Sequence, residues 1–306
     1  MLNGILLIDK PEGFTSHDVV AKLRGMVHQK RIGHAGTLDP LATGLLVVLL
    51  GSATRASDAA SGQDKEYIAR LRLGMETDTQ DSTGTVLRQC EVNVSREDVQ
   101  KMLPRFTGDI LQTPPMYSAV QVDGKRLYAL ARKGVEVQRE RRAISIPLLE
   151  LLPEDGGSAN GVEYTLRVCC SKGTHIRALC ADLGEALGCG GCMTGLRRVR
   201  SGAFSIKDAL TLEQVKAALE NGTLKEYILP IQQVYASLPE VHLNEAGDIR
   251  AMHGAFFTVE HLKEGCIPPE GTQCRVYDSG GSFRQIGESR MVDRGGTAIF
   301  CKTHFC

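Results

Sequence analysis

A segment at residues 31–51, RIGHAGTLDPLATGLLVVLLG, carries the side chains whose types and spacing are best suited to chemistry. Its glycines surround a loop that holds His34, Thr37 and Asp39 ahead of an apolar run. Pro40 pushes Asp39 out of the helical conformation, because the proline ring crowds the residue before it. We therefore expect the Asp39 carboxylate on an extended loop. Aspartate–proline pairs also mark ordinary turns, so these residues alone favour catalysis no more than a structural role.

A second segment, CCSKGTHIRALCADLG at residues 169–184, predicts a strand that leads directly into a helix. His175 and Arg177 then fall in the first helical turn, where the helix dipole disfavours a cation. An arginine there is explained if it pairs with a carboxylate or phosphate docked at the helix terminus. An exposed, solvated arginine is the alternative. Together with the loop aspartate, the segment predicts an Asp39–Arg177 pair.

The common enzyme motifs are absent from the chain. It has no phosphate-binding loop, dinucleotide glycine fingerprint, HExxH or GxSxG. Cys189 and Cys192 form a CxxC pair, but a tetrahedral zinc site needs four ligands. The nearest further cysteines fall in a predicted strand and on an apolar helix face: Cys169, Cys170 and Cys180. We expect buried thiols there, and neither a metal nor an organic cofactor.

The composition is that of an ordinary globular protein of roughly two domains, with 306 residues, 42% of them hydrophobic and 24% charged. The longest strictly apolar run, residues 45–50, is far shorter than the roughly 20 residues of a membrane helix. The apolar start at residues 5–8 meets Asp9 and Lys10 at once, which argues against a signal peptide. Ten cysteines without such a signal indicate cytosolic thiols. We expect a cytoplasmic monomer that requires no protein partner.

Positive charge is concentrated in two segments, although the whole chain carries 36 basic and 36 acidic residues. The segment at 117–145 has three acidic residues and seven basic ones: Lys125, Arg126, Arg132, Lys133, Arg139, Arg141 and Arg142. The segment at 165–202 has two acidic residues and six basic ones: Arg167, Lys172, Arg177, Arg197, Arg198 and Arg200. Such local surpluses fit a polyanionic partner held by one surface. Charge alone favours the plainer interpretation, a set of solvated faces.

The apolar periodicity predicts strands and helices in no regular order, which is typical of the α+β class. The predicted strands are 3–8, 45–50, 65–73 and 162–168, and the predicted helices are capped or opened by Ser16, Ser95, Thr174 and Thr211. A boundary is expected near residues 237–239. Beyond it the chain is rich in turns, with short strands at 272–277 and 297–302, and predicts a small β-rich unit at residues 238–306.

Several blocks of the chain, in order, resemble one family: DKPEGFTS, GHAGTLDPLATG, KEYIARLRLG, PPMYSAVQVDGKRLYALARKG, and CSKGTHIR followed by GLRRVRSG. They are similar to the bacterial tRNA pseudouridine-55 synthases, the TruB family, over about the first 235 residues. The resemblance implies a catalytic domain at 1–237 with a mixed, mainly antiparallel sheet and a thumb-like insertion at about 117–145. Residues 238–306 resemble more loosely the small RNA-binding, PUA-like domain of such enzymes.

The implied activity is isomerisation of uridine 55 in the T-arm of tRNA to pseudouridine, by base flipping and without a cofactor. In this resemblance Asp39 is the nucleophilic catalyst, and Arg177 pairs with it and holds it ionised and oriented. Attack at the ribose, attack at the ring and elimination at C2′ all stay open. Tyr67 stacks on the target base with its hydroxyl near the site of proton transfer, although a strand tyrosine is more often a core residue.

The remaining site residues also follow from the resemblance. His34 fills the gap left by the flipped base, Leu196 walls the pocket, and Lys10 supports the floor. In the thumb, Arg139, Arg141 and Arg142 grip the RNA as the segment closes over the T-loop.

His175 departs from the family pattern, which has tyrosine at this position. The helix terminus, Arg177 and the exclusion of water by a flipped base all lower the pKa of His175 from about 6.5, whereas a nearby Asp39 raises it. Neutral imidazole is therefore expected to stack in place of a phenol. We expect activity to fall around pH 6 as imidazolium forms.

Two rival functions remain. A non-catalytic tRNA-binding or tRNA-folding module would keep the basic segments without needing Asp39. A hydrolase that uses Asp39 is disfavoured, because no partnering general acid stands at a suitable spacing.

Overall fold

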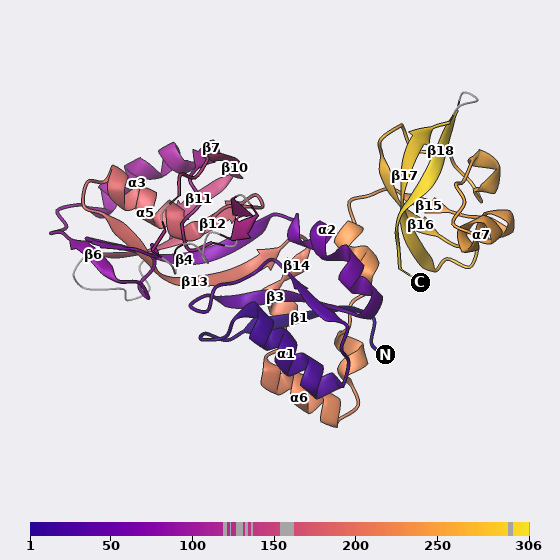
Figure 1. The fold of residues 1–306 in the computed structure, drawn as a ribbon, viewed down its shortest axis with the longest axis horizontal. Coiled ribbons are helices and arrows are strands. Elements are labelled where there is room, and N and C mark those ends of the chain that lie inside the picture. The colour runs from indigo at the N-terminus through magenta and orange to yellow at the C-terminus, as the bar shows by residue number, and fades with distance from the viewer. Residues whose placement is uncertain are drawn as a thin grey trace.

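The computed structural model describes residues 1–118, 121–122, 124–126, 131, 134–135, 137–153, 162–292 and 296–305. Figure 1 shows a larger part built around one long sheet and a smaller part that holds the last four strands. Phe305 and Ile286 of the smaller part pack with Val234 and Tyr235 of the larger part. The predicted division after residue 237 into a catalytic and an RNA-binding domain stays a prediction.

One eight-stranded sheet organises the larger part. Its strands are β1 (Gly4–Lys10), β2 (Ile32–Ala35), β3 (Thr43–Leu50), β4 (Lys65–Leu73), β11 (Leu148–Leu151), β12 (Glu163–Cys170), β13 (Gly191–Ser201) and β14 (Phe204–Ser205). The order is β1–β3–β13–β4–β12–β11, with β2 paired to β3 and β14 to β13. Only β3 and β13 run parallel; the other pairs are antiparallel. The predicted α+β fold with a mixed, mainly antiparallel sheet is confirmed.

Strand β3 is buried on both faces, which explains its unbroken apolar sequence. Alternate residues from Leu45 pack with α2 (Ser57–Ser61), and those from Leu46 pack against α1 (Ser16–Val27) and α6 (Leu212–Glu220). Because both faces lie in core, the segment that precedes β3 leaves the sheet from a rigid base. That segment is the loop with Asp39.

Strand β4 has one buried face, as its alternating sequence predicts. Tyr67 and every second residue after it lie in the core cluster that includes α5 (Ile176–Ala186), whereas Arg70 and Arg72 are exposed. Register across β13 places Tyr67 opposite Arg198. A shift of one residue would turn Tyr67 to the other face, so the apolar alternation fixes its direction.

The larger part has further helices and strands outside this sheet. They are β5 (Met75–Thr77), β6 (Val86–Gln89), α3 (Arg96–Met102), β7 (Gly108–Gln112), β8 (Gln121–Val122), β9 (Lys125–Arg126) and β10 (Arg142–Ile146), with 3-10 helices η1 (Gly51–Ala56), η2 (Leu103–Phe106), η3 (Ile206–Asp208), η4 (Leu224–Tyr227) and η5 (Ile231–Tyr235). None of the helices within the described ranges is both long and apolar enough to cross a membrane.

The smaller part has a four-stranded sheet in the order β15–β16–β17–β18. It comprises β15 (Glu240–His242), α7 (Glu245–Met252), η6 (Val259–His261), β16 (Gln273–Tyr277), β17 (Phe283–Met291) and β18 (Thr297–His304). Strands β16 and β18 agree with the expected strands. The sequence reading missed β17, whose charged and polar residues interrupt the apolar alternation.

Two helix starts differ from the prediction, and both differences bear on the site. Thr15, not Ser16, caps α1 by a capping box with Asp18, which leaves Ser16 buried inside the first turn. Helix α5 starts at Ile176 with His175 at its N-cap, not at Thr174. The predicted helix starts at Ser95 and Thr211 are both correct, and each residue caps its helix, α3 or α6, with a capping box.

Candidate active site

The loop that carries Asp39 is anchored on both sides of it. The Leu38 N–H donates to Ser16 Oγ at 2.8 Å, and the Ser16 hydroxyl lies 3.2 Å from the Leu38 carbonyl. The residue that the sequence suggested as a helix cap therefore fixes the backbone immediately before Asp39.

Lys10 anchors the loop on the other side of Asp39, at Pro40. Its fully buried Nζ donates to the carbonyls of Pro11 at 2.8 Å, Phe14 at 2.6 Å and Pro40 at 3.4 Å. Burial lowers the pKa of Lys10 to about 8, and the charge of Asp39 acts in the opposite direction. Lys10 thus ties the first turn to the Asp39 loop and does not line the cavity.

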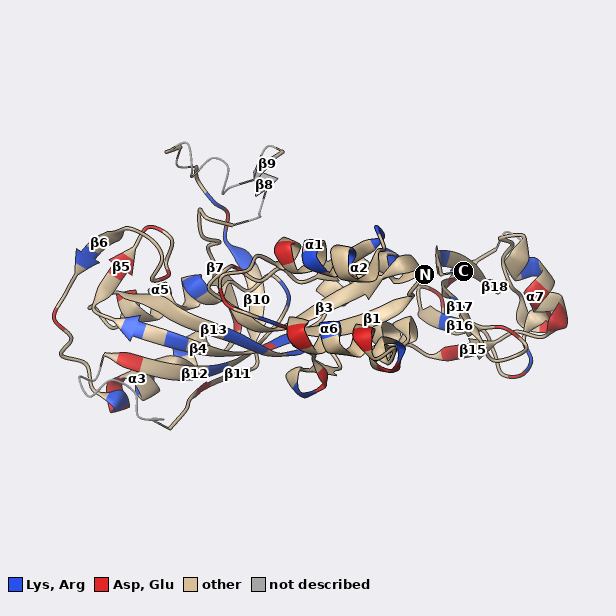
Figure 2. Cartoon of the chain, turned by 90° about the horizontal axis from the view of Figure 1, so that it is seen from below, with Lys and Arg blue, Asp and Glu red and all other residues tan. Residues whose placement is uncertain are grey.

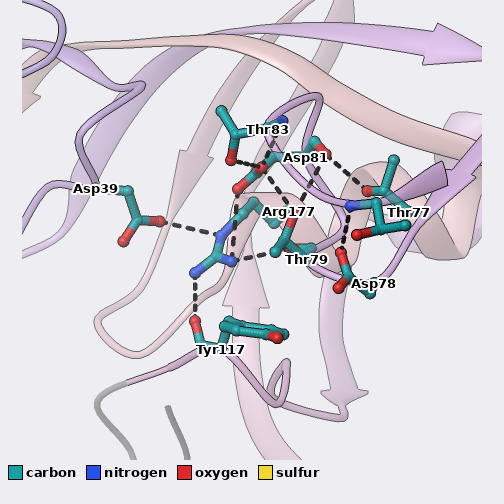
Figure 3. A network of polar contacts seen from close by, with 9 residues as sticks. Asp39, Thr77, Asp78, Thr79, Asp81, Thr83, Tyr117 and Arg177 are labelled. Atoms are coloured by element: carbon teal, nitrogen blue, oxygen red, sulfur yellow. Dashed lines mark hydrogen bonds and ion pairs between the residues drawn. The ribbon is translucent and has the colours of Figure 1, made fainter. Parts of the chain in front are cut away.

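Arg177 binds Asp39 and also three groups from other segments (Figure 3). Its Nε lies 3.0 Å from Asp39 Oδ2. Its Nη1 donates to the Thr79 carbonyl at 2.9 Å, and its Nη2 donates to the Tyr117 carbonyl at 2.7 Å. Because the Arg177 side chain is only 9% exposed and the Asp39 side chain is 44% exposed, a buried cation presents a carboxylate that solvent or substrate can reach.

Asp81 supplies a second carboxylate on the far side of Arg177. Its Oδ2 lies 3.6 Å from Arg177 Nη1. Its Oδ1 accepts hydrogen bonds from Thr79 Oγ1 at 2.8 Å, from the Thr83 N–H at 3.0 Å and from Thr83 Oγ1 at 2.5 Å. Figure 3 shows the turn between β5 and β6 that holds this carboxylate. Sequence reasoning missed Asp81, because its surroundings, TDTQDSTGT, carry only a turn signal.

A cavity of about 170 Å³ opens beside the Asp39–Arg177 pair. Five of the predicted residues line it: Asp39, Tyr67, His175, Arg177 and Leu196. The other lining residues are Thr37, Leu38, Ser118, Thr174 and Ile176, which come from the same sequence blocks without any separate chemical signal. The structure therefore brings one carboxylate, one guanidinium, two flat rings and apolar side chains around a single space.

His175 is held at the cavity by its backbone. Its N–H donates to Gln112 Oε1 at 2.8 Å, and Gln112 Nε2 donates to the His175 carbonyl at 3.0 Å. Burial, then Arg177 and Arg142, lower the pKa of His175 to about 4. The neutral imidazole expected at pH 7 agrees with this pKa. The expected loss of activity around pH 6 through imidazolium does not, because burial shifts the titration well below that pH.

The remaining predicted residues lie outside the cavity lining. His34 is on β2, where burial lowers its pKa, and its buried Nδ1 has no hydrogen-bond partner among the described residues. Arg139 donates to the Pro114 carbonyl at 3.0 Å, while Arg141 and Arg142 are exposed. Arg132 and Lys133 of the predicted thumb, and the side chains of Lys125 and Arg126, fall outside the described residues.

Most arginines of the second basic segment are engaged within the protein. Arg167 and Arg200 both bind Glu66, at 2.8 Å and 3.1 Å, and Arg197 binds Asp9 at 2.7 Å. Figure 2 shows Lys and Arg residues along β4, β12 and β13 of the central sheet. The side chains of Arg167, Arg197 and Arg200 nevertheless stay 42%, 43% and 39% exposed, so phosphate binding by this segment stays a prediction.

The CxxC thiols are core residues. Cys192 is fully buried, Cys189 is 6% exposed, and burial raises the pKa of Cys192 to about 11. Across the described parts of the chain, no group of three or more His, Cys, Asp or Glu residues is arranged to hold a metal ion.

Comparison with known sequences identifies the class. The TruB family pseudouridylate synthase N-terminal domain matches residues 24–176, and the tRNA pseudouridylate synthase B C-terminal domain matches residues 177–235. The tRNA pseudouridine synthase B of Cupriavidus metallidurans is 41% identical over 95% of this chain and 91% of its own length. The enzyme of the same name from Heliobacterium modesticaldum is 49% identical over 80% of this chain and 78% of its own length.

Solved structures support the same class. The matching chain of a Cbf5–Nop10–Gar1 complex has a TM-score of 0.76 at 27% identity, covering 99% of this chain and 85% of that one. An archaeal box H/ACA Nop10–Cbf5 complex gives a TM-score of 0.73 at 26% identity, covering 99% and 86%. The fold is thus that of a pseudouridine synthase. The chain belongs to the TruB family of pseudouridylate synthases.

The pKa of His175 generates a test. We expect single-turnover rates of the wild type and His175→Tyr to follow the same profile from about pH 5.5 to 8.5, because His175 stays neutral throughout that range. In the unfolded chain His175 titrates near 6.5, so the unfolded state takes up more protons between about 6.5 and 4. The wild type should therefore lose stability across this window as pH falls, and His175→Tyr should lose less.

Denaturant unfolding at several pH values measures the stability difference between the two proteins. A step near pH 6 in the wild-type rate alone, missing from His175→Tyr, would contradict the burial of this ring.

Proposed function

We propose that this chain converts uridine 55 of the T-arm of tRNA to pseudouridine, as a cytoplasmic monomer, with Asp39 as the catalytic carboxylate. The relatives at 41% and 49% identity are named tRNA pseudouridine synthase B, which supports tRNA as the substrate. One observation carries the proposal: a half-exposed carboxylate, aligned by the buried Arg177 at 3.0 Å, at a cavity with the ring of Tyr67 in its wall.

The cavity accounts for base flipping as the mode of entry. A base stacked inside an RNA loop cannot reach a recess in a sheet, so the target nucleotide must turn out of its stack. Tyr67 and the neutral His175 offer flat surfaces to the flipped base, and Leu196 offers an apolar one. In this proposal the His34 ring occupies the gap left in the RNA.

The reaction breaks the C1′–N1 glycosidic bond and forms a C1′–C5 bond after the uracil ring has turned. The C5 proton is then lost and N1 gains a proton, so the nucleoside keeps its composition. Attack by Asp39 at C1′, attack at the ring and proton abstraction at C2′ all require a carboxylate fixed close to the glycosidic bond of the flipped nucleotide. Arg177 contributes by holding that carboxylate in one orientation.

The grip on the RNA is assigned to two other parts of the chain. Arg139, Arg141 and Arg142 belong to the proposed thumb at about 117–145, which closes over the T-loop. Residues 238–306 form the proposed PUA-like domain that contacts RNA beyond the loop. Lys10 supports the floor of the site through the Pro40 carbonyl.

A non-catalytic tRNA-binding module accounts less well for the site. An exposed carboxylate that faces RNA repels phosphate, and a pure binding surface gains nothing from a buried arginine that holds it there. A hydrolase is also disfavoured, because Asp39 is the one carboxylic acid among the described residues that line the cavity.

The first test replaces Asp39 by asparagine. We expect Asp39→Asn to bind tRNA nearly as tightly as the wild type but to release no tritium from tRNA labelled at uridine C5, because the amide keeps the shape without the nucleophile. The Asp39 side chain is nearly half exposed, so losing its ion pair should change the free energy of unfolding by about 1 kcal/mol or less.

Mapping of pseudouridine in the same tRNA decides the position. Wild-type product at a site other than 55 would overturn the positional part of the proposal. Turnover by Asp39→Asn would overturn the role of the carboxylate.

The second test reverses charge in the proposed thumb. Arg141→Glu combined with Arg142→Glu should weaken tRNA binding and flatten its dependence on salt, since each lost phosphate contact removes about 0.7–0.9 from the log–log slope. A matched control, Lys216→Glu with Lys225→Glu on α6 and η4, makes the same charge change at exposed positions elsewhere. Equal slopes for both double variants would show that the thumb arginines face solvent.

A further inference from the structure

Arg198 is the largest fully buried side chain of the protein's described residues, at 1% exposure. It stands opposite Tyr67 in the β13–β4 register, and its guanidinium acts to lower the pKa of the Tyr67 phenol. Its Nε donates to the Leu45 carbonyl at 2.7 Å, and its Nη2 donates to the Gly36 carbonyl at 2.9 Å. Those two carbonyls lie on either side of the Asp39 loop.

The fit around this guanidinium is close. Gly36 has a φ of +73°, and a Cβ there would lie 3.1 Å from Arg198 Nη1. Two more buried cations stand nearby: Lys10 and Lys65, each with a pKa lowered to about 8 by burial, and Arg198 adds to both shifts. Within the described residues, no carboxylate forms a salt bridge with Arg198.

A buried guanidinium without a carboxylate is costly, because carbonyl dipoles replace its hydration only in part. A neutral donor could hold a neutral phenol at lower cost. A cation at this place becomes favourable when the phenol carries negative charge, since a charge-assisted hydrogen bond to a phenolate is roughly twice as strong as a neutral one. The surroundings of Tyr67 are therefore suited to a transient tyrosinate.

We propose that Arg198 is a positioning residue that fixes the Tyr67 hydroxyl and stabilises its tyrosinate form during proton transfer. The proposal rests on the proposed function, in which Tyr67 moves the proton. After the C1′–C5 bond has formed, the Tyr67 phenol gives its proton to N1, and the tyrosinate then accepts the proton that leaves C5. One proton moves from C5 to N1 overall, and Tyr67 returns to its starting state.

Among the charged groups around Tyr67, Arg198 is the one that favours the tyrosinate form. Burial raises the pKa of Tyr67, and the charge and hydrogen bond of Arg198 lower it. The other ionisable groups that face the ring are Cys170 of β12 and Asp39, and both act against the tyrosinate. Removing Arg198 should therefore leave the phenol harder to ionise and its hydroxyl less well placed.

A double-mutant cycle tests the proposal. We expect Arg198→Met to lower the single-turnover rate about tenfold or more, with the Kd for tRNA within about twofold of wild type. In a Tyr67→Phe background the same substitution should change the rate less than about twofold, because the hydroxyl through which it acts is gone. Arg198→Lys keeps the charge and should recover part of the rate.

A matched control comes from the neighbouring cation. Lys65→Met also replaces a buried cation by an apolar side chain, but Lys65 donates to the Ser61 and Gln63 carbonyls and not to Tyr67. The factor by which Lys65→Met lowers the single-turnover rate should be the same in the wild-type and Tyr67→Phe backgrounds. If Arg198→Met also lowers the rate by the same factor in both backgrounds, Arg198 acts only through the fold and the proposal is wrong.

A second measurement stays decisive if Arg198→Met fails to fold or Tyr67→Phe shows no turnover. The ultraviolet absorbance of tyrosinate, taken as wild type minus Tyr67→Phe, reports the titration of Tyr67 without any substrate. In the Arg198→Lys background this titration should move to higher pH, because a single ammonium group cannot bind the Leu45 and Gly36 carbonyls and also act on the Tyr67 hydroxyl. An unmoved titration would contradict the proposal. Turnover by Asp39→Asn would instead overturn the proposed function, so the two failures are distinguishable.

Discussion

One buried guanidinium determines the geometry of the site. Arg177 enters from the first turn of α5 and binds groups from three separate segments: Asp39 of the loop before β3, Thr79 with Asp81 of the turn after β5, and Tyr117. A buried cation must find such partners, because each unsatisfied donor would cost about 1–3 kcal/mol. The need to satisfy Arg177 therefore draws these segments together. The carboxylate left nearly half exposed is Asp39, which the substrate can reach.

The rest of the fold supplies the rigidity that this arrangement requires. Strand β13 pairs with β4 along most of its length and with β3 only at Arg197 and Arg198, so it joins the two halves of the sheet where the Asp39 loop ends. Below the loop, Lys10 and Ser16 bind the backbone on both sides of Asp39. Loop residues are usually mobile, but these anchors give Asp39 the fixed position that its proposed catalytic role requires.

Local physics made much of the fold predictable. The alternation in β4, the apolar run of β3 and the capping boxes of α3 and α6 need only neighbouring residues to be recognised, and all are present. The partners of a buried polar group come from distant segments, which no spacing rule reveals. Asp81 looked like a turn residue and Arg198 like part of a basic surface. The direction of the His175 pKa shift was predicted, but its extent was not, since the degree of burial is a property of the assembled cavity.

The central claim is that catalysis depends on the forked geometry of Arg177 as well as on its charge. Arg177→Lys keeps the charge but cannot reach four groups, so the carboxylate should lose its alignment while the RNA surface stays intact. Single-turnover rate and tRNA affinity, measured on the same preparation, test this directly. The account predicts a rate lowered by about a hundredfold or more with a Kd within about twofold of wild type. An unchanged rate would contradict it, as would a loss confined to binding.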